Sequence, residues 1–318
     1  MSKGVHRRRS LGGRGRTIQL LAVIATLTIA VGCASRFGRT NEAVIVGVLE
    51  EVPGTFGNES SSRKVRVLFR KSRNTWQAYQ SNCPDRECLQ KAPSLFPRTV
   101  TWTVTYSGRS LGVVDAQTPD AFNTYSDIGL QTIAAGTRVP TVGERSLEWA
   151  GFLDQPVYRP LVTVSAPEWR DPDDWKQTAI SEQMRSALRR AFRAKFPNVE
   201  NCTTPEENLA RRWEYSDEDI GMTDAHASNK NWTLAAVSLR DYRCDGPPDA
   251  PYLDQLFSVD PAGRVAFIGG EMRYLDAGDY DDDGRSEVIV SIVGYNRGGY
   301  ALLFDEFARR ATFEFNYH

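Results

Sequence analysis

The chain has 318 residues, with 39 Lys and Arg against 40 Asp and Glu and a formal net charge of −1. A chain of this length in which 41% of the residues are hydrophobic can bury a full core, and we expect one or two domains. Nucleic-acid binding usually shows as a basic patch, and the mild acidity of the chain without its basic N-terminal segment argues against a nucleic acid as a partner.

Residues 1–32 have the organisation of a secretory signal peptide. A start with six basic residues and no acidic one precedes an apolar stretch from Ile18 to Val31. That stretch has about 14 residues, fewer than the roughly 20 of a membrane-spanning helix. The small residue Gly32 then precedes Cys33. This order predicts cleavage before Cys33. Removing the six cations leaves the mature chain near −7.

The sequence Ala30-Val31-Gly32-Cys33 resembles the lipobox of bacterial lipoproteins, with Ala30 where that family prefers Leu. The resemblance implies an acyl chain such as palmitate on Cys33, residues 33–42 as a tether, and a membrane as partner. The family's inner-membrane retention signal, an Asp after the Cys, is absent. In an organism with an outer membrane this implies sorting there, facing the periplasm or the cell surface. An ordinary signal peptide or a short anchor helix is the alternative.

Four cysteines remain when Cys33 carries lipid, namely Cys83, Cys88, Cys202 and Cys244. Export places them in an oxidising compartment, where an even number predicts disulfide bonds. Of the three pairings, proximity in the sequence favours Cys83–Cys88 and Cys202–Cys244. The second would close a loop of about 40 residues and contribute on the order of 3–4 kcal/mol in the chain-entropy model. A zinc site is the alternative, which a C-x4-C pair without a nearby His disfavours.

Residues 43–165 are predicted to form an antiparallel β domain. The expected strands are 43–49, 64–69, 99–106, 111–114 and 157–164. Residues 99–106 alternate between apolar and polar, as a half-buried strand does, and the turn at Ser107-Gly108-Arg109 predicts a hairpin with 111–114.

Residues 166–318 are predicted to form a second domain from one amphipathic helix and an antiparallel sheet. Asp171 is a suitable cap, Pro172 suits the first turn, apolar residues follow at i, i+3, i+4 spacing, and Pro197 ends the helix. The expected strands are 232–239, 256–259, 265–268, 287–293, 300–304 and 311–317. The predicted fold class is therefore β-rich α+β.

The segment from Asp279 to Glu287 has the pattern D-x-D-x-D-G, with carboxylates at Asp279, Asp281 and Asp283. Such spacing wraps the chain around one hard cation, and calcium prefers oxygen ligands at this density. Gly284 permits the sharp turn. The pattern predicts a calcium site, and an acidic turn that binds no specific ion is the alternative.

An EF-hand begins with the same spacing, but its twelfth position is a bidentate Glu and here is Val290. The flanks, Met272 to Leu275 and Glu287 to Val293, also favour strands over helices. The segment instead resembles the calcium loops of FG-GAP and VCBS-type extracellular repeats. The resemblance implies a calcium-binding hairpin with five ligands. Because all of these ligands would be used in holding one hairpin, we expect a structural role for the ion. These ligands are Asp279, Asp281, Asp283, Arg285 through its carbonyl, and Glu287. The chain's ending resembles that of uncharacterised bacterial secreted proteins.

Catalytic signatures are missing from the sequence. His226 and His318 are the histidines left after the signal, and no G-x-S-x-G, H-E-x-x-H, Walker A or G-x-G-x-x-G motif is present. The sequence therefore favours a non-catalytic cell-envelope lipoprotein, a structural or binding module stabilised by calcium, with an envelope protein or polysaccharide as partner. The alternatives are an envelope-polymer hydrolase, which needs two facing carboxylates or a site around His226, and an adhesion or assembly partner.

The chain has seven tryptophans. Core positions are the favoured interpretation of them, and a sugar-stacking face is the alternative.

Overall fold

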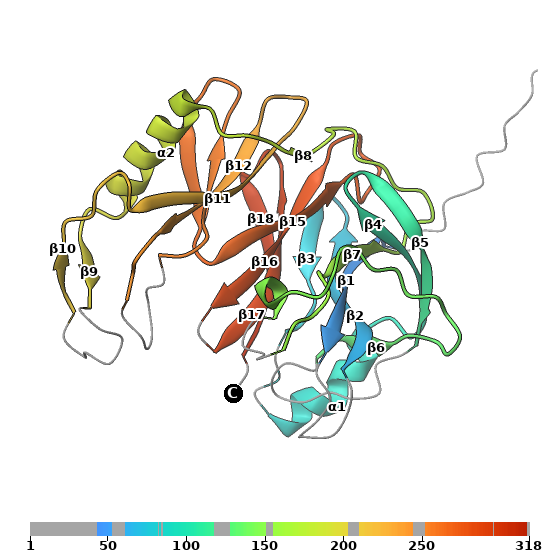
Figure 1. Ribbon diagram of the computed structural model, residues 1–318. Coiled ribbons are helices and arrows are strands. Elements are labelled where there is room, and N and C mark those ends of the chain that lie inside the picture. The colour runs from blue at the N-terminus through green and yellow to red at the C-terminus, as the bar shows by residue number, and fades with distance from the viewer. Residues whose placement is uncertain are drawn as a thin grey trace, which may run out of the picture. The chain divides into compact units, whose positions relative to one another are not determined.

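The computed structural model describes residues 43–52, 61–81, 83, 85–117, 128–150, 155–202, 210–243, 252–294 and 296–316. These residues belong to one compact unit that begins at Ala43. The predicted signal peptide and tether with Cys33, as well as Cys244 and His318, lie outside them. Antiparallel sheets dominate the described part and two α-helices accompany them, so the predicted β-rich α+β class is confirmed (Figure 1).

The first sheet takes its strands from residues 45 to 164. Its order is β3-β2-β1-β7-β4-β5, with β6 also paired to β2. Strands β4 and β5 form the predicted hairpin, with Tyr106 opposite Arg109. The strands are β1 (Ile45–Val52), β2 (Ser62–Ser72), β3 (Thr75–Ala78), β4 (Val100–Tyr106), β5 (Arg109–Ala116), β6 (Leu130–Thr132) and β7 (Leu161–Val164). A short 3-10 helix, η1 (Leu147–Trp149), precedes β7.

The predicted Cys83–Cys88 disulfide is confirmed, and Cys88 lies in the first turn of helix α1 (Arg86–Leu95). The sequence predicted the disulfide and no helix at this position. Asp85 caps the helix by accepting the N–H of Cys88 at 2.8 Å. The helix was missed because it buries little, Ala92 being its one buried residue. Cys202 is also disulfide-bonded, and its pairing with Cys244 stays a prediction.

Helix α2 (Glu182–Lys195) begins eleven residues later than the predicted cap at Asp171. Ser181 is the actual cap, since its hydroxyl accepts the N–H of Met184 at 3.3 Å. The intervening residues form a short strand, β8 (Lys176–Gln177), which pairs with β11 (Ile220–Ala227). A sheet partner distant in the sequence thus prevents the helix from starting at Asp171.

The strands after α2 form two larger sheets where the sequence predicted one. The five-stranded sheet has the order β14-β13-β12-β11-β8, and α2 packs on it through Leu188 and Phe192 (Figure 1). Its further strands are β12 (Thr233–Leu239), β13 (Gln255–Val259) and β14 (Val265–Gly269). A separate pair consists of β9 (Val199–Asn201) and β10 (Arg211–Trp213).

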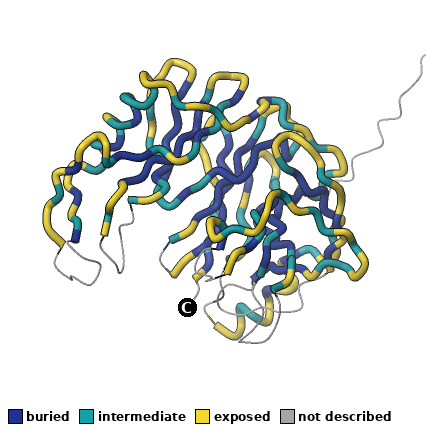
Figure 2. Tube along the Cα trace, viewed as in Figure 1, coloured by how far each residue is buried: buried dark blue, intermediate teal, exposed yellow. Residues whose placement is uncertain are grey.

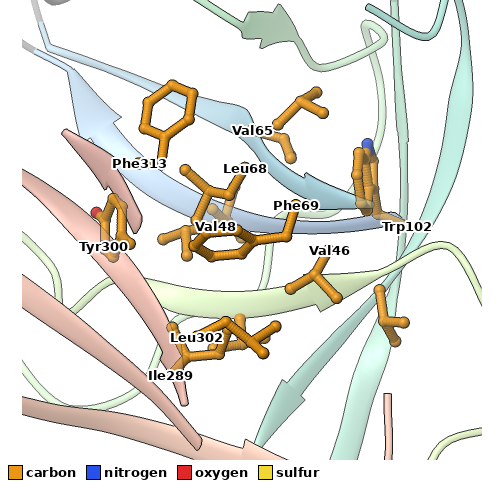
Figure 3. Close-up of a cluster of buried hydrophobic side chains, with 14 of the residues drawn as sticks. Val46, Val48, Val65, Leu68, Phe69, Trp102, Ile289, Tyr300, Leu302 and Phe313 are labelled. Carbon is orange, nitrogen blue, oxygen red and sulfur yellow. The ribbon is translucent and has the colours of Figure 1, made fainter. Parts of the chain in front are cut away.

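The last sheet is a meander of β15 (Met272–Gly278), β16 (Glu287–Gly294), β17 (Arg297–Phe304) and β18 (Arg309–Asn316). Both of its faces are covered, and its strands are largely buried in Figure 2. Ile289, Tyr300 and Leu302 face the first sheet (Figure 3). Val288 and Val290, on the opposite face, pack with residues of the five-stranded sheet. Alternation of side chains across a strand explains this division.

One core cluster therefore joins residues on either side of position 165. Tyr300 also donates a hydrogen bond to Glu50 of β1 at 2.6 Å, and Thr105 of β4 donates one to Asp276 of β15 at 3.0 Å. The first sheet ends before residue 165 and the other sheets begin after it. The division into domains 43–165 and 166–318 stays a prediction. Neither described helix is long and apolar enough to cross a bilayer.

Candidate metal site

The acidic loop joins β15 to β16, so it lies between two strands as predicted. The carboxylates of Asp279, Asp281 and Asp283 each offer an oxygen within 4.8 Å of the others. The structure thus brings together three of the predicted ligands.

The carboxylate of Asp279 accepts hydrogen bonds from the backbone of the loop and fixes its turn. Its Oδ1 accepts the N–H of Asp283 and its Oδ2 accepts the N–H of Gly284, both at 2.9 Å. Gly284 has φ +89°, a conformation in which glycine is favoured. Burial raises the pKa of the Asp279 carboxyl, and the two backbone hydrogen bonds oppose that shift.

Asp281 is the least satisfied carboxylate of the cluster. Its side chain is 5% exposed, and neither oxygen accepts a hydrogen bond from the described residues. The ammonium of Lys71, at the end of β2, makes an ion pair with Oδ2. This single ammonium faces three clustered carboxylates, and a bound cation would offset the remaining repulsion among them. The donor set therefore fits a hard cation.

Glu287 lies behind the loop. Its Oε1 accepts the indole N–H of Trp76 at 3.2 Å and its Oε2 accepts the N–H of Tyr280 at 3.0 Å. Burial, reinforced by the charge of Asp281, raises the pKa of Glu287 to about 8. Glu287 is not part of the three-carboxylate cluster, so its role as a ligand stays a prediction.

The guanidinium of Arg285 forms ion pairs with two carboxylates, Asp283 at 2.9 Å and Asp305 at 3.5 Å. Its N–H donates to Asp283 Oδ1 at 2.9 Å, which tightens the end of the loop. Coordination through the Arg285 carbonyl stays a prediction.

Asp171 and Asp173 hold the loop from outside, a role that sequence reasoning missed. Asp171 accepts a hydrogen bond from the Ser286 hydroxyl, and Asp173 Oδ2 accepts the N–H of Ser286 at 3.3 Å. Asp171 also accepts the N–H of Trp175 at 2.6 Å. The available signal was the acidic run at 171–174, which the sequence assigned to a helix start.

Trp169 packs closely against the base of the loop. A Cβ atom added to Gly278 would lie 2.2 Å from Trp169 Nε1, so only glycine fits there. The Trp169 ring stacks near Tyr280, with centroids 6.4 Å apart. The carbonyl of the next residue, Arg170, accepts the N–H of Asp279 at 2.8 Å.

A groove of about 580 Å³ opens beside the loop, and Asp281, Asp283 and Glu287 form part of its wall. The remaining wall comes from the β2–β3 turn, residues 173–175 and 230–232, and the β17–β18 turn. Segments distant in the sequence thus meet at this groove.

His226 belongs to a separate buried cluster, outside the groove lining. It stacks on Tyr274 with ring centroids 3.7 Å apart, and its Nδ1 is 3.5 Å from Asp224. Burial, together with the charge of Arg159, lowers the pKa of His226 to about 4, so the ring is neutral near pH 7. A catalytic site around His226 stays a prediction.

No protein-family model matches the chain, and the comparisons with curated proteins and with solved structures give no match.

Proposed function

We propose that this protein is a non-catalytic lipoprotein of the cell envelope, a binding module whose fold is stabilised by calcium in the Asp279–Glu287 loop. The observation that carries the proposal is the cluster of three carboxylates within 4.8 Å of one another, in which the Asp281 side chain is 5% exposed and has the single positive charge of Lys71 as its ion-pair partner. A divalent ion there would relieve the repulsion among the three acids.

Calcium suits this set because carboxylate oxygens are its preferred ligands. The described residues of the cluster offer no thiolate or imidazole, the ligands typical of structural zinc. Carboxylates also bind magnesium, but magnesium demands a near-ideal octahedron and keeps several waters. We therefore assign calcium and use magnesium as the comparison ion.

The ion would act at a junction of the fold. Trp76 of β3 bonds Glu287 at one end of the loop, and Lys71 of β2 contacts Asp281. Asp171 and Asp173 bond Ser286 from the segment before β8. Fixing the loop would therefore fix the first sheet and this segment against the last sheet.

The test is thermal unfolding of the purified protein with calcium, with magnesium and with chelator. A ligand at 100 times its Kd stabilises by about 2.7 kcal/mol, and each kcal/mol shifts the Tm of a domain of this size by about 2–4 °C. We expect calcium to raise the Tm by several degrees and magnesium by less. The Asp281→Asn variant should lose the calcium-dependent shift.

Asp282→Asn is the matched control, because its side chain is half-exposed at 51% and its φ of +60° suits Asn. This variant should keep the shift. An unchanged shift in Asp281→Asn, or none in the wild type, would reject the calcium assignment.

The lipid anchor is tested separately. Cys33→Ser removes the thiol that the lipobox resemblance marks for acylation, so the variant should move from the membrane fraction to the soluble fraction and lose incorporation of labelled palmitate. The control is the double variant Cys83→Ser with Cys88→Ser, which removes two cysteines and their disulfide but keeps Cys33, and it should stay with the membrane. A Cys33→Ser protein that remains membrane-bound would contradict the anchor.

A further inference from the structure

Strand β15 is the edge strand of the last sheet, and it contacts strands of both other large sheets (Figure 1). It packs with β11 of the five-stranded sheet and with β7 of the first sheet. A buried ionisable side chain lies at each junction, His226 of β11 at one and Asp276 of β15 at the other. Two such groups at separate junctions give each junction its own dependence on pH.

At the junction with the five-stranded sheet, the His226 ring lies flat on Tyr274 of β15. Their centroids are 3.7 Å apart and their planes differ by 16°. The Nδ1 atom of His226 has no hydrogen-bond partner among the described residues, and Asp224 lies 3.5 Å from it. Burial, together with the charge of Arg159, lowers the pKa of His226 to about 4. Protonation is therefore unfavourable while the ring stays on Tyr274 and favourable once water reaches it.

The charges around His226 do not compensate a proton on the ring. Burial raises the pKa of Asp224, so this carboxyl offers less negative charge in the acidic range where His226 titrates. Arg159 stays positive at every acidic pH, so its repulsion of a protonated ring persists. The remaining charged groups on the elements packed here are Glu148 of η1, Arg273 of β15, Lys176 of β8 and Asp171 before β8.

At the junction with the first sheet, the Asp276 carboxylate is fully buried. It accepts hydrogen bonds from the Thr105 hydroxyl and the Ser107 N–H, both at 3.0 Å. Burial raises the pKa of Asp276 to about 6, although these bonds and the charge of Arg159 oppose the shift. Neutralising this buried charge below pH 6 therefore stabilises the junction. The other titratable groups that face Asp276 are two tyrosines whose pKa values burial raises well above the usual range, Tyr274 and Tyr280.

The guanidinium of Arg159 connects the two junctions. It donates to the carbonyl of Leu275 at 2.7 Å and lies 4.4 Å from the centroid of Trp149. Leu275 stands between Tyr274 and Asp276 in β15. One fixed positive charge thus favours an ionised Asp276 and disfavours a protonated His226.

We infer that β15 is a pH-dependent junction strand: acid loosens its contact with the five-stranded sheet through His226 and tightens its contact with the first sheet through Asp276. The two effects oppose each other in the free energy of global unfolding, but they change which part of the molecule opens first. β11 is able to open locally, because it pairs with β12 on one side and with the two-residue strand β8 on the other.

The experiment is hydrogen–deuterium exchange of the full lipidated protein in detergent, read by mass spectrometry at pH 6.5 and pH 4.5. Chelator is present, so that the acidic loop binds no calcium, and exchange times are corrected for the intrinsic rate at each pH. At the lower pH we expect protection of β11, residues 220–227, to fall and protection of β4, residues 100–106, to rise. Each change should be on the order of twentyfold, since one pK unit corresponds to a factor of ten.

Two variants separate the junctions. His226→Gln should abolish the fall in β11 and leave the rise in β4, whereas Asp276→Asn should abolish the rise in β4 and leave the fall in β11. Each variant tests one junction even if the other variant fails to fold. Glu87→Gln, which changes an exposed acid on α1, should keep both responses.

Three results would overturn the inference. Protection that is the same at both pH values would show that neither group controls its junction. Changes of the same sign in β11 and β4 would show that the sheets open together. Opposite changes that persist in both His226→Gln and Asp276→Asn would assign the pH dependence to other groups.

Discussion

At the residue scale, burial strongly shifts the pKa values of Asp276 and His226, which both lie outside the metal loop. Asp276 is fully buried on β15, accepts hydrogen bonds from the Thr105 hydroxyl and the Ser107 N–H, both at 3.0 Å, and has its pKa raised to about 6, chiefly by burial. The pKa of His226 is lowered to about 4, so the unfolded chain protonates this ring at a higher pH than the folded protein does. The contribution of His226 to stability therefore falls as the pH falls, whereas that of Asp276 falls as the pH rises. The two contributions oppose each other between about pH 4 and pH 6.

Asp276→Asn should separate these contributions. The carboxyl ionises near pH 3.8 when unfolded and near pH 6 when folded, so the wild type loses stability as the pH rises through this interval. The variant lacks that loss. Its unfolding free energy should therefore rise relative to wild type by up to about 3 kcal/mol between pH 4 and pH 7. Urea unfolding at a series of pH values measures this, and a constant difference would contradict it.

Asn is the appropriate replacement because it retains an acceptor for the Ser107 N–H and an amide that can bond the Thr105 hydroxyl. His226→Gln provides the comparison. It should remove the opposite pH dependence, so the wild type should gain stability relative to this variant as the pH rises from about 4 to 6.5.

At the element scale, the β15–β16 hairpin was predictable because its signals are local. The D-x-D-x-D-G spacing and the β-branched residues after it specify a loop between strands. The start of α2 was not predictable in this way. Asp171, Pro172 and Asp173 are good residues for a helix start, but β8 pairs with His226 and Ala227 of β11. That contact is distant in the sequence, and it frees Asp171 and Asp173 to hold Ser286.

Helix α1, in contrast, was not predicted at all, although its start carries a local signal. Its cap at Asp85 is a local signal, yet the cysteine spacing was interpreted only as a disulfide. The helix has ten residues, so its apolar pattern is short, and Ala92 is its one fully buried residue.

At the scale of the whole molecule, the last sheet is the middle layer. It packs with the first sheet through Ile289, Tyr300 and Phe313, and with the five-stranded sheet through Val288 and Val290. Fully burying one such side chain contributes roughly 1.5–3 kcal/mol. The first sheet therefore depends on residues beyond position 165 for its core.

A fragment of residues 43–165 should consequently fail to fold alone. It would expose Val48, Phe69 and their neighbours, which pack against the last sheet (Figure 3). We expect the fragment to lack a cooperative thermal transition and to bind a hydrophobic dye, whereas residues 43–318 melt cooperatively. A monomeric fragment with a sharp transition would show that residues 43–165 form an independent domain.

The sequence by itself determined the β-rich class, the Cys83–Cys88 bond, most strands and the clustering of Asp279, Asp281 and Asp283. Each of these follows from side-chain periodicity or from spacing within about ten residues. Only the tertiary structure decided that Lys71 neutralises Asp281, that Asp171 and Asp173 support the loop, and that a groove opens beside it. These features join side chains from 100 or more positions apart, and their proximity depends on how the sheets pack.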